Sequence, residues 1–228
     1  MLLTFVGYFS EKKYMYEAYL FDLNGTIIDD MHFHARAWHH ILTNDLKATI
    51  SYEDTVLQMY GKNQELLERV FGRGHFTQKQ MDDYSMEKER RYQAAFKPHM
   101  KLIDGLDDFL EKAHQAGIKM AIGSAAIPFN IDFILDSLNL RKYFPVVVSA
   151  DDVTLSKPDP ETFTKGADIL GVAYHKCLVF EDAPKGVEAA KNAGMKAIAL
   201  TTLHTPDEFQ ITDNVLKFIG DYKGLALF

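Results

Sequence analysis

Short apolar runs alternate along the chain with longer segments in which apolar residues recur every three to four positions. The runs have the length of β-strands, and the longer segments have the period of amphipathic helices. The predicted strands cover residues 18–21, 118–123, 145–149, 177–180, 196–200 and 216–219. Strands that alternate with helices favour an α/β fold. We therefore predict a doubly wound, Rossmann-like parallel sheet with helices on both faces.

Residues 31–96 interrupt this alternation, because they show helical periodicity and no convincing strand. We predict helices over residues 31–42, 52–60, 63–71 and 77–96. The charged run at 87–91 has mixed signs and is typical of a solvated helix face. We expect an inserted α-helical cap domain over residues 31–96, a core formed by 16–30 and 97–228, and an N-terminal extension over 1–15.

Composition and charge narrow the classes of partner. The chain has 228 residues, of which 47% are apolar and 25% charged, and its formal net charge is −7. Because no sequence-wide basic field is present, we expect neither nucleic acid nor a membrane as partner. The single cysteine, Cys177, excludes an internal disulfide framework and favours the cytoplasm. We expect a small-molecule ligand and a monomer or weak homodimer.

Polar residues follow the predicted strands where each strand ends. Asp22 follows the first strand, Ser124 the second, and Glu181 and Asp182 the fourth, while Lys157 lies in the loop after the third. Each residue has an ordinary structural explanation as a turn former, helix cap or solvated cation. The carboxyl ends of parallel strands meet at one edge, where ligands bind. Together these residues indicate a phosphate and metal site.

The same residues resemble the motifs of the haloacid dehalogenase superfamily, and the resemblance covers the chain from about Met15. The family motifs D-x-D-G-T, a strand-ending Ser or Thr, K-P and E-D-x-x-x-G correspond to residues 22–26, 124, 157–158 and 181–186. Within the superfamily, Asp29, His34, Arg36 and Trp38 resemble the entry into the helical cap of the β-phosphoglucomutase-like branch. The resemblance implies magnesium-dependent phosphoryl transfer through an aspartyl-phosphate intermediate, with a small phosphate ester as substrate.

The resemblance also implies a role for each residue. Asp22 is expected to be the nucleophile, and Lys157 and Ser124 are expected to stabilise the phosphate. The expected Mg²⁺ ligands are a carboxylate oxygen of Asp22, the main-chain carbonyl of Asn24 and the carboxylate of Asp182, with Glu181 in support. The expected substrate contacts are Ser124, Ala125, Gly25 and His34.

Asn24 departs from the family pattern, which has a second Asp at this position. That Asp exchanges a proton with the leaving group and with water, whereas an amide has no proton to exchange at neutral pH. General acid–base help of roughly 10²–10⁴ in rate should therefore be absent. Three interpretations remain open: an enzyme for substrates with good leaving groups, a non-hydrolysing binding protein or transferase, or an engineered Asp-to-Asn trap.

Two other activities of the superfamily fit the sequence less well. A β-phosphoglucomutase presents cations where this chain has Tyr60 and Gln64, and a Lys-Asn pair in the loop where it has residues 125–128. A second phosphate would be poorly held, which favours a substrate with one phosphate. A haloacid dehalogenase has no need of the metal that Glu181 and Asp182 indicate. We expect residues 60–64 to contribute to specificity.

Overall fold

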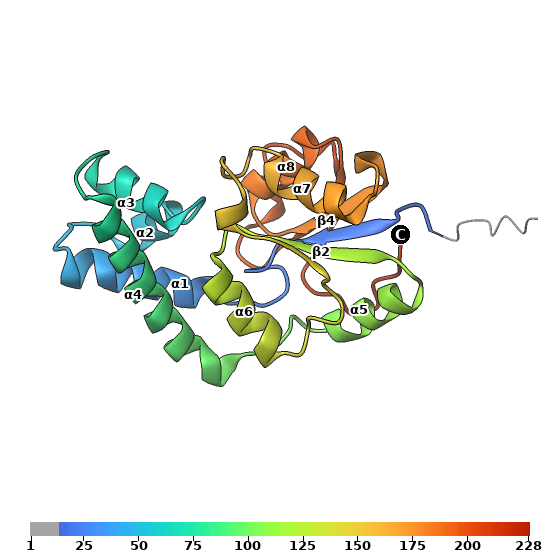
Figure 1. The fold of residues 1–228 in the computed structure, drawn as a ribbon, viewed down its shortest axis with the longest axis horizontal. Coiled ribbons are helices and arrows are strands. Elements are labelled where there is room, and N and C mark those ends of the chain that lie inside the picture. The colour runs from blue at the N-terminus through green and yellow to red at the C-terminus, as the bar shows by residue number, and fades with distance from the viewer. Residues whose placement is uncertain (1–13) are drawn as a thin grey trace, which may run out of the picture.

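The computed structural model describes residues 14–228, and its larger lobe is built on a six-stranded parallel sheet (Figure 1). The strands are β1 (Ala18–Phe21), β2 (Lys119–Gly123), β3 (Val146–Val148), β4 (Cys177–Glu181), β5 (Lys196–Leu200) and β6 (Val215–Ile219). Their order is β3-β2-β1-β4-β5-β6, and every neighbouring pair is parallel. All six predicted strands are confirmed: the bounds of β1 and β5 agree with the prediction, and no end of the other four differs from it by more than one residue.

Helices cover both faces of this sheet because successive side chains of its strands point to opposite sides. Tyr19 and Phe21 of β1 pack with α5 (Leu106–Gln115) and α6 (Pro128–Ser137). Ala18 and Leu20 pack with α7 (Glu161–Leu170) and α8 (Pro184–Asn192) on the other face. Buried on both sides, β1 is apolar throughout, as a central parallel strand should be. The doubly wound α/β class is confirmed.

The smaller lobe is helical and lies to one side of the sheet (Figure 1). It contains α1 (Met31–His40), the π-helical turn η1 (Ile41–Asp45), α2 (Tyr52–Leu57), α3 (Asn63–Phe71) and α4 (Gln78–Phe96). The first two predicted helices are shorter than expected. After His40 the helix widens, and the Leu46 amide donates to the Ile41 carbonyl five residues earlier; α2 ends where Gln58 N donates to Thr55 O. The assignment of the two lobes as separate domains with limits at 30/31 and 96/97 stays a prediction.

Short 3₁₀ turns complete the described chain: η2 (Lys97–His99), η3 (Ala150–Asp152), η4 (Tyr174–Lys176) and η5 (Pro206–Glu208). The two segments that cross between the lobes pair with each other. Ile28 and Leu102 form an isolated antiparallel bridge, and the Ile103 amide donates to the Ile27 carbonyl at 2.9 Å. The helical lobe is therefore joined to the sheet by a single paired strip of backbone.

Most of the predicted N-terminal extension, residues 1–13, lies outside the described residues. Within residues 14–228, no helix is both long and apolar enough to cross a membrane.

Candidate active site

Four of the predicted site residues meet at the carboxyl edge of the sheet because β1 lies between β2 and β4. Asp22 continues β1, and its amide donates to the Phe180 carbonyl of β4 at 2.9 Å. Ser124 follows β2, and its amide donates to the Val148 carbonyl of β3. Glu181 is the last residue of β4, and Asp182 follows it. Residues far apart in the sequence are thus held at one edge by the sheet itself.

Lys157 reaches into the middle of this group from the loop before α7. Its Nζ atom donates to Asp22 Oδ1 at 2.6 Å, to Glu181 Oε1 at 2.7 Å and to the Gly123 carbonyl at 3.0 Å. The second oxygen of Glu181 accepts from the Ala183 amide at 2.8 Å. Although burial lowers the pKa of Lys157, the two carboxylates raise it above its usual value. Lys157 is therefore a fixed cation, and Glu181 holds it in place.

The site has more acidic than basic groups. Asp22, Glu181 and Asp182 are all buried, and Lys157 is the cation that pairs with two of them. Burial, more than the neighbouring charges, raises the pKa of Asp182 well above its usual range and also raises that of Asp22, although Lys157 lowers the latter. Uncompensated carboxylates in a buried site are the setting that a divalent cation neutralises.

The residues present fit Mg²⁺, which prefers hard oxygen ligands and retains several waters. Within residues 14–228, no three His, Cys, Asp or Glu side chains converge as an all-side-chain metal centre. The available donors are therefore the carboxylates of Asp22 and Asp182 together with main-chain oxygen. The main-chain donor expected from the sequence is the carbonyl of Asn24, two residues after Asp22.

Gly25 makes room for this arrangement. Its φ of +74° lies in the left-handed region, and a Cβ atom built there would lie 2.0 Å from Asp182 Oδ2. The Gly25 carbonyl accepts from Thr202 Oγ1 at 2.7 Å, which anchors the loop to the segment after β5. A larger residue at position 25 would displace the Asp182 carboxylate.

A cavity of about 160 Å³ opens over these groups and is lined from both lobes. The sheet lobe contributes Ser124 and Ala125, and the hydroxyl of Ser124 accepts from the Ala126 amide at 3.1 Å. The helical lobe contributes His34 and the segment 60–63, part of the predicted specificity segment. The predicted site residues that line the cavity are Asp22, Asn24, His34, Ser124, Ala125, Lys157, Glu181 and Asp182, whereas Gly25 lies behind Asp182.

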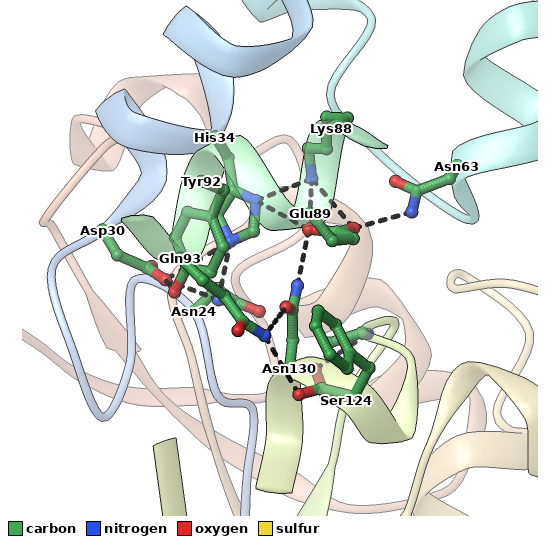
Figure 2. A network of polar contacts seen from close by, with 12 residues as sticks. Asn24, Asp30, His34, Asn63, Lys88, Glu89, Tyr92, Gln93, Ser124 and Asn130 are labelled. Atoms are coloured by element: carbon green, nitrogen blue, oxygen red, sulfur yellow. Dashed lines mark hydrogen bonds and ion pairs between the residues drawn. The ribbon is translucent and has the colours of Figure 1, made fainter. Parts of the chain in front are cut away.

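Lys88 and Glu89 also line the cavity, and the sequence-based interpretation of the 87–91 run was wrong for both of them. Each side chain is buried, and Lys88 Nζ lies 3.1 Å from both carboxylate oxygens of Glu89 (Figure 2). Lys88 Nζ also lies 2.7 Å from His34 Nδ1. Glu89 accepts from Asn63 of α3 at 2.7 Å and from Asn130 of α6 at 2.6 Å. Glu89 therefore links the two lobes across the cavity.

A signal for this burial is present in α4. Met81, Ser85, Lys88, Tyr92 and Phe96 recur at intervals of three and four residues and are all buried, so they form one face of the helix. Two polar members within an otherwise apolar face mark a buried polar network rather than a solvated surface. The mixed charges of residues 87–91 favoured the interpretation as a solvated surface over this helical periodicity.

Asn24 faces the same network from the sheet lobe. Its Nδ2 atom donates to Asp30 Oδ2 at 2.7 Å and lies 3.1 Å from His34 Nε2. Tyr92 of α4 donates its hydroxyl hydrogen to the same oxygen of Asp30. The sequence singled out Asn24 and His34, but it did not place Asp30 or Tyr92 in the site. The motif around Asp22 is thus continuous with buried polar residues of the helical lobe (Figure 2).

Carboxylates, a buried lysine and a cavity at the carboxyl edge of a doubly wound sheet define an α/β enzyme that acts on a small molecule. Residues 19–200 match the model of the haloacid dehalogenase-like hydrolase family, and the chain belongs to that family. The family predicted from the motifs is confirmed.

Individual members of the family are similar over most of the chain. A validoxylamine A 7'-phosphate phosphatase of Streptomyces hygroscopicus subsp. limoneus is 28% identical over 92% of this chain and 97% of its own length. A fructose-1-phosphate phosphatase of Escherichia coli is 31% identical over 83% of this chain and 100% of its own length. The crystal structure of a β-phosphoglucomutase from Clostridium difficile has a TM-score of 0.78 at 22% identity, and the match covers 92% of this chain and 93% of that one.

Proposed function

We propose that this hydrolase is a magnesium-dependent phosphatase that removes the phosphate from a small phosphorylated metabolite, with Asp22 as the nucleophile. The observation that carries the proposal is the Asp22 carboxylate at the end of the central strand, 2.6 Å from the Lys157 ammonium and open to a cavity. The two phosphatases similar to this chain over most of its length support the same reaction class.

In the first step, a carboxylate oxygen of Asp22 attacks phosphorus and forms an acyl phosphate, while the ester P–O bond breaks and its electron pair leaves with the alcohol oxygen. Lys157 and the hydrogen-bond donors near Ser124 and Gly25 stabilise the charge on the phosphoryl oxygens. In the second step, water cleaves the acyl phosphate, which returns Asp22 to a carboxylate and releases inorganic phosphate. A Mg²⁺ ion held by Asp22, Asp182 and the Asn24 carbonyl would supply further neutralisation of phosphate charge.

The cations around the cavity favour a substrate with one phosphate. Four lysines line the cavity within the described chain, and each already contacts a protein oxygen: Lys62 the Val153 carbonyl at 2.6 Å, Lys88 Glu89, Lys157 Asp22, and Lys185 Glu188 at 3.5 Å. A second phosphate would have to displace one of these partners. Sugar or polyol monophosphates, which offer hydroxyl groups to the rest of the cavity, fit this environment, and their leaving oxygen must take its proton from water because Asn24 has none to give.

The proposal is tested with a panel of phosphate monoesters and acyl phosphates, assayed for release of inorganic phosphate. With Mg²⁺ we expect turnover of p-nitrophenyl phosphate and acetyl phosphate, because their leaving groups depart without a proton. Chelation or Asp22→Asn should abolish turnover. Acid quenching during turnover should trap a phosphoryl group on Asp22.

Undiminished turnover in chelator would overturn the metal assignment, and undiminished turnover by Asp22→Asn would overturn the assignment of the nucleophile. Asp151→Asn, which removes an exposed acid outside the cavity, is the matched control and should retain the activity of the parent protein.

The second candidate function is a phosphometabolite-binding protein with little or no turnover, and Asn24 is the observation that favours it. Calorimetry distinguishes the two, since a binding protein would bind fructose 1-phosphate in the presence of Mg²⁺ without releasing phosphate. A monomer or weak homodimer in the cytoplasm, acting without a nucleic acid or membrane partner, completes the proposal.

A further inference from the structure

Asp30 is a fully buried carboxylate with an unusual orientation. It precedes α1 at the N-cap position, where an Asp side chain ordinarily accepts a main-chain N–H of the first helical turn. In this protein the Asp30 side chain makes no such capping bond. Since burying a carboxylate costs free energy, the partners that it does have require an explanation.

Those partners converge on one oxygen, Asp30 Oδ2. It accepts from Asn24 Nδ2 at 2.7 Å and from the Tyr92 hydroxyl, and it lies 3.3 Å from His34 Nε2 (Figure 2). The other oxygen, Oδ1, is buried and has no hydrogen-bond partner among the described residues. The Asp30 side chain therefore contacts Asn24 instead of capping α1, and one of its carboxylate oxygens remains without a hydrogen bond within residues 14–228.

The carboxylate determines which end of the Asn24 amide faces it. An ionised carboxylate only accepts hydrogen bonds, so the NH₂ group of Asn24, and not its carbonyl oxygen, must point toward Asp30. The second contact of Nδ2, to His34 Nε2 at 3.1 Å, lies on the same end of the amide. Asp30 thus fixes the amide orientation and leaves Asn24 Oδ1, a hydrogen-bond acceptor, for other partners.

We propose that Asp30 is a positioning residue for Asn24, and that the two side chains form a matched amide–carboxylate pair. An Asp introduced at position 24 alone would place two carboxylates 2.7 Å apart in a buried site, where like charges repel. A productive acid at position 24 therefore requires residue 30 to change with it. The catalytic part of this proposal rests on the proposed phosphatase function, whereas the pairing itself does not.

The test is a cycle of four proteins: the parent, Asn24→Asp, Asp30→Asn, and the exchanged double variant Asn24→Asp/Asp30→Asn. The exchange keeps one amide and one carboxylate in contact but reverses their positions. Thermal unfolding measures the pairing without any substrate. We expect Asn24→Asp to lower Tm by about 5 °C or more, and we expect the exchange to recover at least about half of that loss.

Single-turnover rates measure the catalytic part. With glycerol phosphate, whose alkoxide must be protonated as it leaves, the exchanged variant should react at least about 10-fold faster than Asn24→Asp and than the parent. With p-nitrophenyl phosphate the same comparison should give a smaller change. Asn24→Asp/Asp29→Asn is the matched control, because it removes the exposed neighbouring acid instead; it should recover neither Tm nor rate.

Additive effects on Tm, or failure of the exchanged variant to fold where Asn24→Asp folds, would overturn the pairing. Recovery of Tm without the selective gain on the alkyl ester would overturn the catalytic part alone. If no variant turns over any phosphate ester, the proposed function fails, and the thermal cycle still decides whether Asn24 and Asp30 are paired.

Discussion

Gly186, at the start of α8, packs directly against the carboxylate that holds Lys157. A Cβ atom built at this position would lie 1.7 Å from Glu181 Oε1. Gly166 is also helical, in α7, but the nearest atom to its added Cβ would be Leu20 Cδ2 at an ordinary 3.5 Å. A comparison of alanine substitutions at the two glycines therefore separates the effect of helix propensity from the effect of the close contact with Glu181.

We expect Gly186→Ala to destabilise the protein by about 1–3 kcal/mol, because the buried Glu181 side chain must move. Gly166→Ala should instead be neutral or stabilising by about 0.5–1 kcal/mol, because alanine favours the helix. Urea unfolding of both variants measures the difference. Equal effects at the two positions would contradict the close approach at Gly186.

Asp182 is the residue at which metal binding can be tested apart from turnover. Mg²⁺ that binds only the folded protein stabilises it by mass action, by about 2.7 kcal/mol at 100 times its dissociation constant. We expect the corresponding rise in Tm for the parent and its loss in Asp182→Asn, because an amide cannot replace the ligand charge. A Mg²⁺-dependent rise of the same size in both proteins would show that the ion binds elsewhere.

The residues at strand ends could be predicted from the sequence because strand order brings them together without any contribution from side-chain detail. Asp22, Ser124 and Glu181 need only their positions after β1, β2 and in β4 to be placed. Asp30 could not be predicted in this way. As an Asp before a helix, it has the sequence signature of an N-cap, and only the approach of Asn24 and Tyr92 explains why its side chain turns elsewhere.

At the scale of elements, α4 presents two different surfaces. Glu87 and Arg91 lie on the outer side, where they pair at 2.8 Å. Lys88 and Glu89 lie inside, and Glu89 is bonded to α3 through Asn63 and to α6 through Asn130. Within one charged run, Glu87 and Arg91 thus form a surface ion pair, whereas Glu89 lies in a buried junction of α3, α4 and α6.

Glu89→Gln should therefore cost about 3–5 kcal/mol near pH 7, since it leaves the buried Lys88 without its anion. Glu87→Gln on the outer side is the control and should change stability by no more than about 1 kcal/mol. Chemical denaturation of both variants makes the comparison. A small effect at Glu89 would show that its contacts in the folded protein contribute little.

The pKa of the Glu89 carboxyl predicts how the stability of the protein changes at low pH. Although burial opposes it, the nearby Lys88 and His34 and the amides of Asn63 and Asn130 lower the pKa of Glu89 to about 2 from an ordinary 4.5. A lowered pKa contributes stability that is complete above about pH 4.5 and is lost as the pH falls toward 2. The stability difference between the parent and Glu89→Gln should therefore narrow across this window, as measured by unfolding at a series of pH values.

The elements themselves were largely predictable because hydrophobic period is a local property. The strands and the long helices of the insert follow it, whereas the π-helical turn η1 and the early end of α2 depend on backbone hydrogen bonds that no side-chain pattern specifies. The burial of Lys88 and Glu89 depends on Asn63 and Asn130, which lie 26 and 41 residues from Glu89. Contacts of that range are not visible in a window of one helix.

At the scale of the molecule, the two lobes touch across the cavity as well as along the crossing strip. Ser156 Oγ donates to Glu65 Oε1 at 2.8 Å, and Gln93 Nε2 donates to Asn130 Oδ1 at 2.9 Å. These contacts join the sheet lobe to α3 and α4. We expect these contacts to break when the lobes separate.

We expect Ser156→Ala/Asn130→Ala to favour separation of the lobes, because both side chains hold the helical lobe from the sheet side. Amide hydrogen exchange should then become faster in the crossing segments 27–30 and 97–103, while the amides of β1 and β4 keep their protection. Ser137→Ala, at the far end of α6, is the control. Unchanged exchange at the crossings would mean that the lobes are held together by other contacts.

The bridge between Ile28 and Leu102 pairs the two segments through which the chain enters and leaves the helical lobe. The chain leaves the sheet lobe near Ile28 and returns near Leu102, and these two residues are paired. The segment between them is therefore a loop whose ends are held together, whatever its length. The entropy of closing such a loop rises only with the logarithm of its length, by about 0.6 kcal/mol for each doubling. We therefore expect changes in the length of this segment to cost the sheet little stability.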